Sequence, residues 1–302
     1  MFNDIQPCIF PASPRVIVIG DVHGDIQRFM ACLYALGIFN QKLEWTAQPQ
    51  NTIVVQLGDQ VDSASRTTDE SENWEVMPDV HMLTLTTALD NVARVSGGRV
   101  ISLLGNHEVM NIIGEFTYVS QNSRAKMALS KRAASFQPGG MYARMLAKRN
   151  VVVKIGSHLF CHGGLLPHHL IPVDGRLHLL NELTRMLITG ADLSQDQRNI
   201  LTQAVTGMQG ILWTRMYVEL AMANSEMLAE AVGQVLGMTG CTRIYCGHNT
   251  VPCVSTLVNG SIYLVDAGLS RAYGTKRIQL IEIVNMDTPS QEIRTIELTP
   301  QT

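Results

Sequence analysis

The hydrophobic residues in the first third of this 302-residue chain fall into two alternating patterns. Continuous runs rich in β-branched residues at 15–20, 52–57 and 99–104 predict buried strands, because a strand covered on both faces is apolar throughout. Between the runs, apolar residues recur every three or four positions over 26–36 and 80–95, which predicts two helices. Strands that alternate with helices in this way predict a layered α/β fold.

The rest of the chain is first helical and then returns to strands. A helical pattern covers 121–148 with a break at 138–140, and a strand pair is expected over 151–161. A segment rich in Leu, Met, Ala and Glu at about 175–240 predicts a helical insertion. Further strands are expected at 242–246, 253–257, 261–265, 276–284 and 292–298, with a hairpin turn at Asn259-Gly260.

One long connection stands apart from these elements by its composition. Residues 62–79 are polar and acidic, and they predict an exposed loop. Its acidic side chains are expected to be solvated; they are Asp69, Glu70, Glu72 and Glu75.

Composition and charge narrow the class of protein. With 46% hydrophobic and 16% charged residues, the chain can bury a substantial core and is not disordered. A net charge of −3 excludes the basic excess of most nucleic-acid-binding proteins, and no apolar run is long enough to span a membrane. Six scattered cysteines without a CxxC pair predict reduced thiols. We therefore expect one domain over residues 1–302 in the cytoplasm, with no nucleic-acid or membrane partner.

Polar side chains with metal-binding chemistry directly follow five of the predicted strands. Because sites in α/β folds gather at the carboxyl ends of strands, we expect these side chains to meet. The candidate ligands are Asp21, His23, Asp59, Asn106, His162 and His248. Imidazole mixed with oxygen donors suits Mn, Fe or Zn better than Ca or Mg. A central aspartate could bridge two such ions, which together can activate water against a phosphoryl group.

Five motifs in this order resemble the metallophosphoesterase superfamily and its phosphoprotein-phosphatase branch. They are Gly20-Asp-Val-His-Gly24, Gly58-Asp-Gln-Val-Asp62, Gly105-Asn-His-Glu108, Phe160-Cys-His-Gly-Gly164 and Cys246-Gly-His248. Three further stretches are similar to the Shewanella-like group of bacterial-type phosphatases: residues 105–114, 211–215 and 266–274. The resemblance extends over about residues 15–275. It implies a four-layered α/β/β/α calcineurin-like sandwich with a helical insertion that walls the substrate cleft.

The resemblance also implies roles for the candidate residues. One metal would be held by Asp21, His23 and Asp59, and Asp59 would bridge to a second metal held by Asn106, His162 and His248. A metal-bound hydroxide would attack the phosphorus directly, and His107, oriented by Asp62, would protonate the leaving oxygen. The cofactors would be two divalent ions, with Mn favoured over Fe or Zn. The partner would be a protein or peptide phosphorylated on Ser/Thr or Tyr.

The chain departs from the family pattern directly after Asp62. The family continues with Arg-Gly at this point and uses the arginine to hold phosphate, whereas this chain has Ser63 and its next arginine is Arg66. Arg66 could reach back to the phosphate, and Arg215 is the stronger candidate for a phosphate clamp because it lies in a matching motif. Asn106 is a further candidate for a phosphate contact, and Arg271 and Tyr273 are weaker candidates for the pocket wall.

Two other functions remain open from the sequence. The first is hydrolysis of diadenosine polyphosphates or other nucleotides, since such enzymes resemble this branch. The second is a binding protein that holds phosphorylated partners in a weakened site, which the missing arginine would explain. Four histidines outside the motifs are expected to have surface or capping roles; they are His158, His168, His169 and His178.

Overall fold

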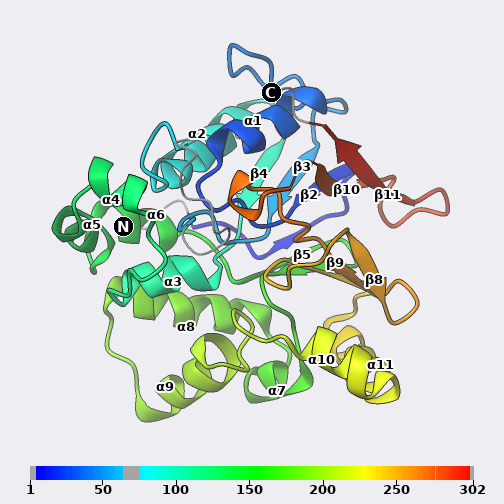
Figure 1. Cartoon of the computed structure of the whole chain (residues 1–302). Coiled ribbons are helices and arrows are strands. Elements are labelled where there is room, and N and C mark those ends of the chain that lie inside the picture. The colour runs from blue at the N-terminus through cyan, green and yellow to red at the C-terminus, as the bar shows by residue number, and fades with distance from the viewer. Residues whose placement is uncertain (1–4, 64–74, 276, 300–302) are drawn as a thin grey trace.

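Two mixed β-sheets packed face to face form the centre of the computed structural model, which describes residues 5–63, 75–275 and 277–299 (Figure 1). The first sheet has the order β11-β10-β2-β3-β4. Its strands are β2 (Arg15–Ile19), β3 (Ile53–Gln56), β4 (Arg99–Ser102), β10 (Ile278–Val284) and β11 (Glu292–Leu298). The second has the order β1-β5-β6-β7-β9-β8. Its strands are β1 (Ile9–Phe10), β5 (Val152–Ile155), β6 (His158–Cys161), β7 (Arg243–Cys246), β8 (Ser255–Leu257) and β9 (Ile262–Leu264).

Strand alternation explains why the two sheets stack. Val16 and Val18 of β2 point inward and pack with Phe160 and Tyr245 of the second sheet, in a core from which solvent is excluded. The intervening residues of β2 point outward into a separate core beneath helices α1 (Ile26–Ala35) and α2 (His81–Val95). Both helices cover the outer face of the first sheet in Figure 1.

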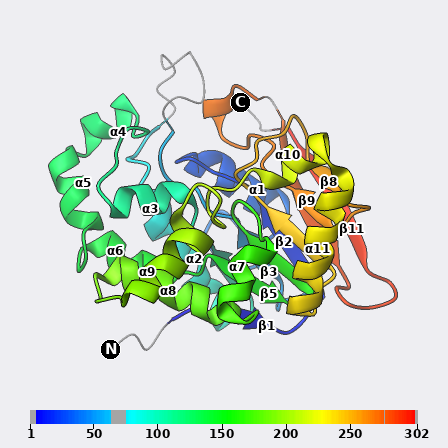
Figure 2. The ribbon, with the colours of Figure 1, turned by 90° about the horizontal axis from the view of Figure 1, so that it is seen from below.

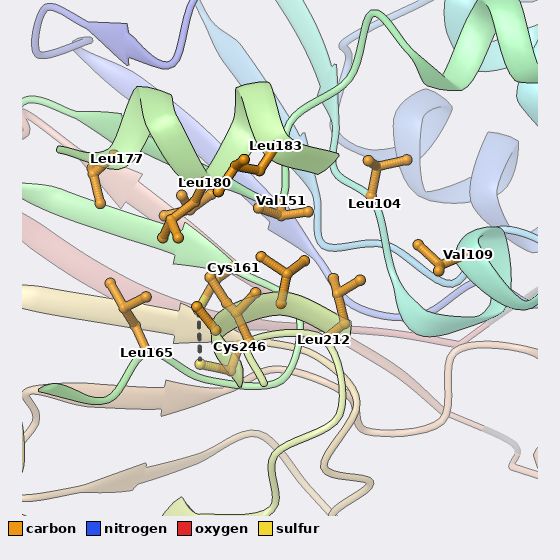
Figure 3. Packing of buried hydrophobic residues seen from close by; sticks show 14 of the residues in the cluster. Leu104, Val109, Val151, Cys161, Leu165, Leu177, Leu180, Leu183, Leu212 and Cys246 are labelled. Atoms are coloured by element: carbon orange, nitrogen blue, oxygen red, sulfur yellow. Dashed lines mark hydrogen bonds between the residues drawn. The ribbon is translucent and has the colours of Figure 1, made fainter. Parts of the chain in front are cut away.

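The outer face of the second sheet is covered by helices from the middle of the chain. Figure 2 shows α7 (Pro167–Leu170), α8 (Leu177–Thr189) and α11 (Ser225–Thr239) across this face. In Figure 3, leucines of α8 lie above the buried Cys161 and Cys246 of β6 and β7, whose sulfur atoms are 3.7 Å apart. The predicted α/β/β/α order of layers is confirmed.

The predicted helices of the middle segments are present in shorter pieces. Residues 121–148 form α4 (Gln121–Lys126), α5 (Leu129–Phe136) and α6 (Met141–Leu146). The segment at about 175–240 contains α8, α9 (Gln195–Leu201), a π-helical turn (Thr202–Thr206), α10 (Met216–Ala223) and α11. No helix in the described ranges is both long and apolar enough to cross a membrane. All six cysteines are free, as expected.

Three expectations about local structure are corrected. Strand β8 begins at Ser255 rather than at 253, and β10 begins at Ile278, whereas residue 276, its expected start, lies outside the described residues. The exposed loop expected at 62–79 is correct for Val76 and Met77 but wrong for Asp62, Glu75 and Asp79, which are buried. Glu75 is only 4% exposed, and its carboxylate accepts hydrogen bonds from the hydroxyls of Ser63 and Ser120, which compensate for its burial. The other three acidic residues of that loop lie outside the described residues.

Candidate metal centre and active site

Five strand ends meet at one edge of the sandwich and bring the six predicted metal ligands together. Strands β2, β3 and β4 of the first sheet lead into the ligands of the first three motifs, and β6 and β7 of the second sheet lead into the last two. All six side chains are buried; they are Asp21, His23, Asp59, Asn106, His162 and His248. The side chains therefore meet at the ends of strands, as expected, and the cluster spans the seam between the two sheets.

The carboxylate of Asp59 lies at the centre of this cluster. Its Oδ2 atom is 3.3 Å from His162 Nε2, 3.8 Å from His107 Nε2 and 4.0 Å from His23 Nε2. Two groups with metal-binding spacing share this aspartate, one with His23 and His107 and the other with His162 and His248. A shared carboxylate between two ligand groups is the arrangement that a pair of bridged ions requires.

Backbone carbonyl groups orient the three ligand imidazoles. Each ring donates one N–H to a carbonyl oxygen, so the other nitrogen is the one that could bind a metal. The three bonds are His23 Nδ1 to Val61 O (3.1 Å), His162 Nδ1 to Leu57 O (2.8 Å) and His248 Nε2 to Trp213 O (3.0 Å). For His23 and His162 the remaining nitrogen faces Asp59.

The charges of the cluster fit a bound cation. Burial, followed by the neighbouring carboxylate of Asp266, holds the pKa of Asp21 well above its usual range. Although burial alone would lower it, the carboxylates of Asp59 and Asp21 raise the pKa of His162 to about 10. The buried carboxylates thus favour a positive charge among them, which divalent ions would supply through the same donor atoms.

Unusual backbone conformations aim these side chains into the site. Four of the motif residues have left-handed φ angles, which non-glycine residues rarely adopt: His23 (44°), Asp59 (51°), Asp62 (66°) and His248 (58°). Gly58 has φ 98°, and a Cβ atom there would lie 2.6 Å from the backbone nitrogen of Gly105. The sharp turn after β3 therefore needs glycine at this position.

His107 and Asp62 form a buried pair beside the ligands. His107 Nδ1 is 3.0 Å from Asp62 Oδ2, and the His107 backbone N–H donates to Asp59 Oδ1 at 3.0 Å. Burial raises the pKa of Asp62, against the opposing effects of His107 and of the guanidinium of Arg132. The pair has the geometry expected of an imidazole that is oriented by a carboxylate.

A cleft of about 480 Å³ opens onto this centre. Its floor contains five of the six candidate ligands together with His107. Its walls are Tyr118, Met208, Gln209, Trp213, Arg215, Glu219, Thr250 and Tyr273. Five of these eight come from residues 208–219, so the helical insertion walls the cleft as expected.

The arginines predicted to hold phosphate or to line the pocket differ in their positions relative to the cleft. Arg215 lines the cleft and donates from Nη1 to the backbone oxygen of His248 at 3.0 Å. Arg66 lies outside the described residues. Arg271 forms a two-bond ion pair with the buried Asp25 and is not among the residues that line the cleft, whereas Tyr273 is.

Two of the four histidines outside the motifs, His168 and His169, contact the backbone oxygen of Gln209 in the cleft wall. His169 accepts the backbone N–H of Leu166 at Nδ1 and donates from Nε2 to the backbone oxygen of Gln209 at 2.6 Å. Its expected capping role is confirmed. His158 is fully buried in a stack with Tyr245, so the surface role expected as its alternative is wrong.

Several residues that support the site carried no assigned role in the sequence. Glu108 accepts backbone N–H groups of Asp59, Gln60 and Gly105. The motif Gly105-Asn-His-Glu108 could have indicated this role, because a glutamate three residues after the N-cap position often accepts backbone N–H groups. Arg132 is different, because it lies 70 residues from Asp62 in a helix without a motif, and only the fold brings the two together.

Comparisons with known proteins agree with this geometry. The family model "Calcineurin-like phosphoesterase" matches residues 14–249. Shewanella-like protein phosphatase 2 of Arabidopsis thaliana is 23% identical, over 93% of this chain and 78% of its own length. An uncharacterised protein of Schizosaccharomyces pombe is 31% identical, over 91% of this chain and 79% of its own.

Solved structures share the fold at low sequence identity. A cold-active protein-tyrosine phosphatase from a psychrophilic Shewanella has a TM-score of 0.76 at 22% identity, covering 96% of this chain and 83% of that one. A serine/threonine phosphatase of Saccharomyces cerevisiae has a TM-score of 0.55 at 14% identity, covering 98% of this chain and 86% of that one.

Proposed function

The chain belongs to the calcineurin-like phosphoesterase family, and from this premise we propose that it is a dimetal phosphoprotein phosphatase. The observation that carries the proposal is the central position of Asp59. Its Oδ2 atom lies 3.3–4.0 Å from three imidazoles that come from both sheets, at the floor of an open cleft. A site of this composition at the seam of two sheets suits hydrolysis of a phosphomonoester.

The proposed cofactors are two divalent ions, Mn²⁺ first, with Fe and Zn as alternatives. One ion would be held by Asp21, His23 and Asp59. The other would be held by Asp59 and by the side chains of Asn106, His162 and His248. When bound, the ions would activate the attacking water and neutralise charge on the phosphoryl group.

The protein's own residues complete the proposed mechanism. His107 Nδ1 is held by Asp62, so Nε2 is the atom that can donate a proton to the leaving oxygen. Arg215 reaches the cleft from the start of α10, where its guanidinium can hold a non-transferring phosphoryl oxygen. His107 thus supplies the proton and Arg215 the charge.

We further propose that the substrate is phosphotyrosine rather than phosphoserine or phosphothreonine. Three aromatic side chains stand over the catalytic floor: Tyr118 lies 5.0 Å from the ring of His107, Tyr273 lies 5.8 Å from His23, and Trp213 lies 6.3 Å from His248. Aromatic walls favour a phenyl ring through stacking and edge contacts. The Shewanella enzyme of similar fold is described as a tyrosine phosphatase, which agrees with this choice.

The test is phosphate release from peptides of one sequence that carry phosphotyrosine or phosphothreonine. Metal-stripped protein would be measured before and after addition of Mn²⁺, with Asp59→Asn as the inactive control. We expect Mn²⁺-dependent release that is at least about tenfold faster from phosphotyrosine. Faster release from phosphothreonine would reject the tyrosine preference. Cleavage of diadenosine polyphosphate alone would make the protein a nucleotide hydrolase, and peptide binding without hydrolysis would make it a binding protein.

A further inference from the structure

The carboxylate of Asp62 has a second partner on the side away from His107. Its Oδ2 atom faces the imidazole at 3.0 Å, and its Oδ1 atom accepts a hydrogen bond from Arg132 Nη2 at 2.8 Å. Arg132 is 0% exposed, which is exceptional for a guanidinium. A fully buried cation therefore lies directly behind the carboxylate that orients the proposed general acid.

Arg132 is fixed in place by two other buried groups. Nη1 and Nη2 donate to the two oxygens of Asp79 at 2.6 and 2.9 Å, and Nε donates to Asn111 Oδ1 at 2.6 Å. Asp79 is anchored in turn by the hydroxyl of Ser123. The guanidinium therefore donates hydrogen bonds to three different side chains, which hold its plane in a single orientation.

The same two anchors also hold Asp62 directly. The backbone N–H of Asp62 donates to Asp79 Oδ2 at 2.7 Å, and the amide of Asn111 donates to Asp62 Oδ2 at 2.9 Å. Arg132 closes this ring of contacts by joining Asp79 and Asn111 to the free oxygen of Asp62. Both oxygens of Asp62 therefore have hydrogen-bond partners that fix the orientation of its carboxylate plane.

We propose that Arg132 is a positioning residue for the reaction, acting through Asp62 to aim His107 at the leaving oxygen. This inference rests on the proposed function, because it assigns to Arg132 the support of the general acid. Arg132 cannot replace the phosphate arginine that is missing after Asp62, since its guanidinium is completely buried and does not line the cleft. It supports proton transfer and not phosphate binding.

A positioning role of Arg132 can be distinguished by experiment from a purely structural role. An oriented general acid matters for a poor leaving group such as phenolate and hardly at all for a good one such as 2,4-dinitrophenolate. Loss of positioning therefore slows phenyl phosphate selectively. Loss of folded structure, or of the metal centre, slows both esters by the same factor.

The test uses a charge-matched pair of substitutions, because removing Arg132 alone would leave two buried carboxylates without a cation. In Arg132→Met with Asp79→Asn, kcat for phenyl phosphate should fall about 10- to 100-fold, and kcat for 2,4-dinitrophenyl phosphate by less than about threefold, with the metal content unchanged. Arg132→Lys keeps the charge without the fork, and should show a smaller loss of the same selective kind.

The matched control is Arg149→Lys, which alters another buried arginine that bonds to Gln60 and not to Asp62. It should change both rates by one common factor. Equal losses on both esters in the Arg132 variants, or no loss, would overturn the inference while leaving the proposed function standing. If the double variant does not fold, Arg132→Lys decides by the same criterion. A wild-type protein that hydrolyses neither ester would reject the proposed function, and the inference with it.

Discussion

Glu108 Oε2 accepts the backbone N–H of Asp59 at 2.9 Å, and the same oxygen accepts the N–H of Gly105 at 2.8 Å. The other oxygen accepts the N–H of Gln60. One buried carboxylate thus connects the turn after β3 to the start of α3 (Asn106–Ile112). The position of Asp59, on which the whole cluster depends, is fixed through its backbone by Glu108.

Replacing Glu108 with glutamine should therefore weaken both the fold and the metal centre. The amide group of glutamine places N–H donors against backbone N–H donors, so buried bonds are lost at a cost of about 1–3 kcal/mol in the free energy of unfolding. Metal affinity should fall about 10- to 100-fold, as for other outer partners of ligands. Urea unfolding and metal titration would measure the two effects. The exposed Glu230→Gln is the control, and a variant as stable as that control would contradict the prediction.

Asp59→Asn should abolish both metal retention and turnover. The central oxygen of Asp59 is the one that both ligand groups share, and an amide supplies no negative charge to bridge two cations. We expect a loss of activity greater than the roughly 100-fold typical of outer partners. Metal analysis and phosphate release would be compared with the exposed Asp192→Asn. Wild-type activity in Asp59→Asn would contradict the dimetal assignment.

His107→Asn should separate metal binding from catalysis. The proposed role of His107 is proton donation, so the metal content should be retained while kcat falls about 10²- to 10⁴-fold. The exposed His178→Asn provides the matched control. A variant that loses its metal instead would make His107 a ligand, which its spacing from His23 and Asp59 also permits.

Acid should weaken the wall of the cleft through His169. Burial, followed by the neighbouring His168, lowers the pKa of His169 to about 3. The unfolded state takes up a proton near pH 6.5 while the folded state does not. The stability contributed by neutral His169 is therefore complete above pH 6.5 and is lost as the pH falls toward 3.

Urea unfolding at pH 7.5 and pH 5 would measure this effect. Wild-type protein should lose about 2 kcal/mol more than His169→Gln between these two pH values. The variant removes the titrating imidazole and leaves every other group in place, so contributions from the metal site cancel in the comparison. Equal losses in both proteins would show that the imidazole of His169 is not kept neutral by the fold.

The meeting of the candidate site residues could be predicted from the sequence because the motifs that carry them are local. Each motif lies at the end of an apolar run, so a strand and its candidate ligand are adjacent in the sequence, as with Asp21 after β2 or His162 after β6. The spatial meeting of these ends follows from the general placement of sites at strand ends. Nothing beyond local pattern was needed to select the six residues.

The support behind the floor could not be predicted in this way. Arg132 pairs with carboxylates 53 and 70 residues earlier, and the buried Glu75 accepts a hydrogen bond from a serine 45 residues later. Such pairs leave no periodic signal, because either partner alone has the composition of a solvated surface. The expectation that Glu75 is solvated was wrong for this reason.

The two halves of the cleft have separate origins in the chain. The floor is built from the turns that follow the strands and from the start of α3, where left-handed backbone and close packing restrict which residues fit. The walls are built largely by residues 208–219, which comprise the connection before α10 and the first turn of that helix. Residues 208–219 also carry Arg215 and the carbonyl of Trp213 that bonds to His248, so exchange of this segment between relatives would change the entrance of the cleft and the contacts that hold its floor together.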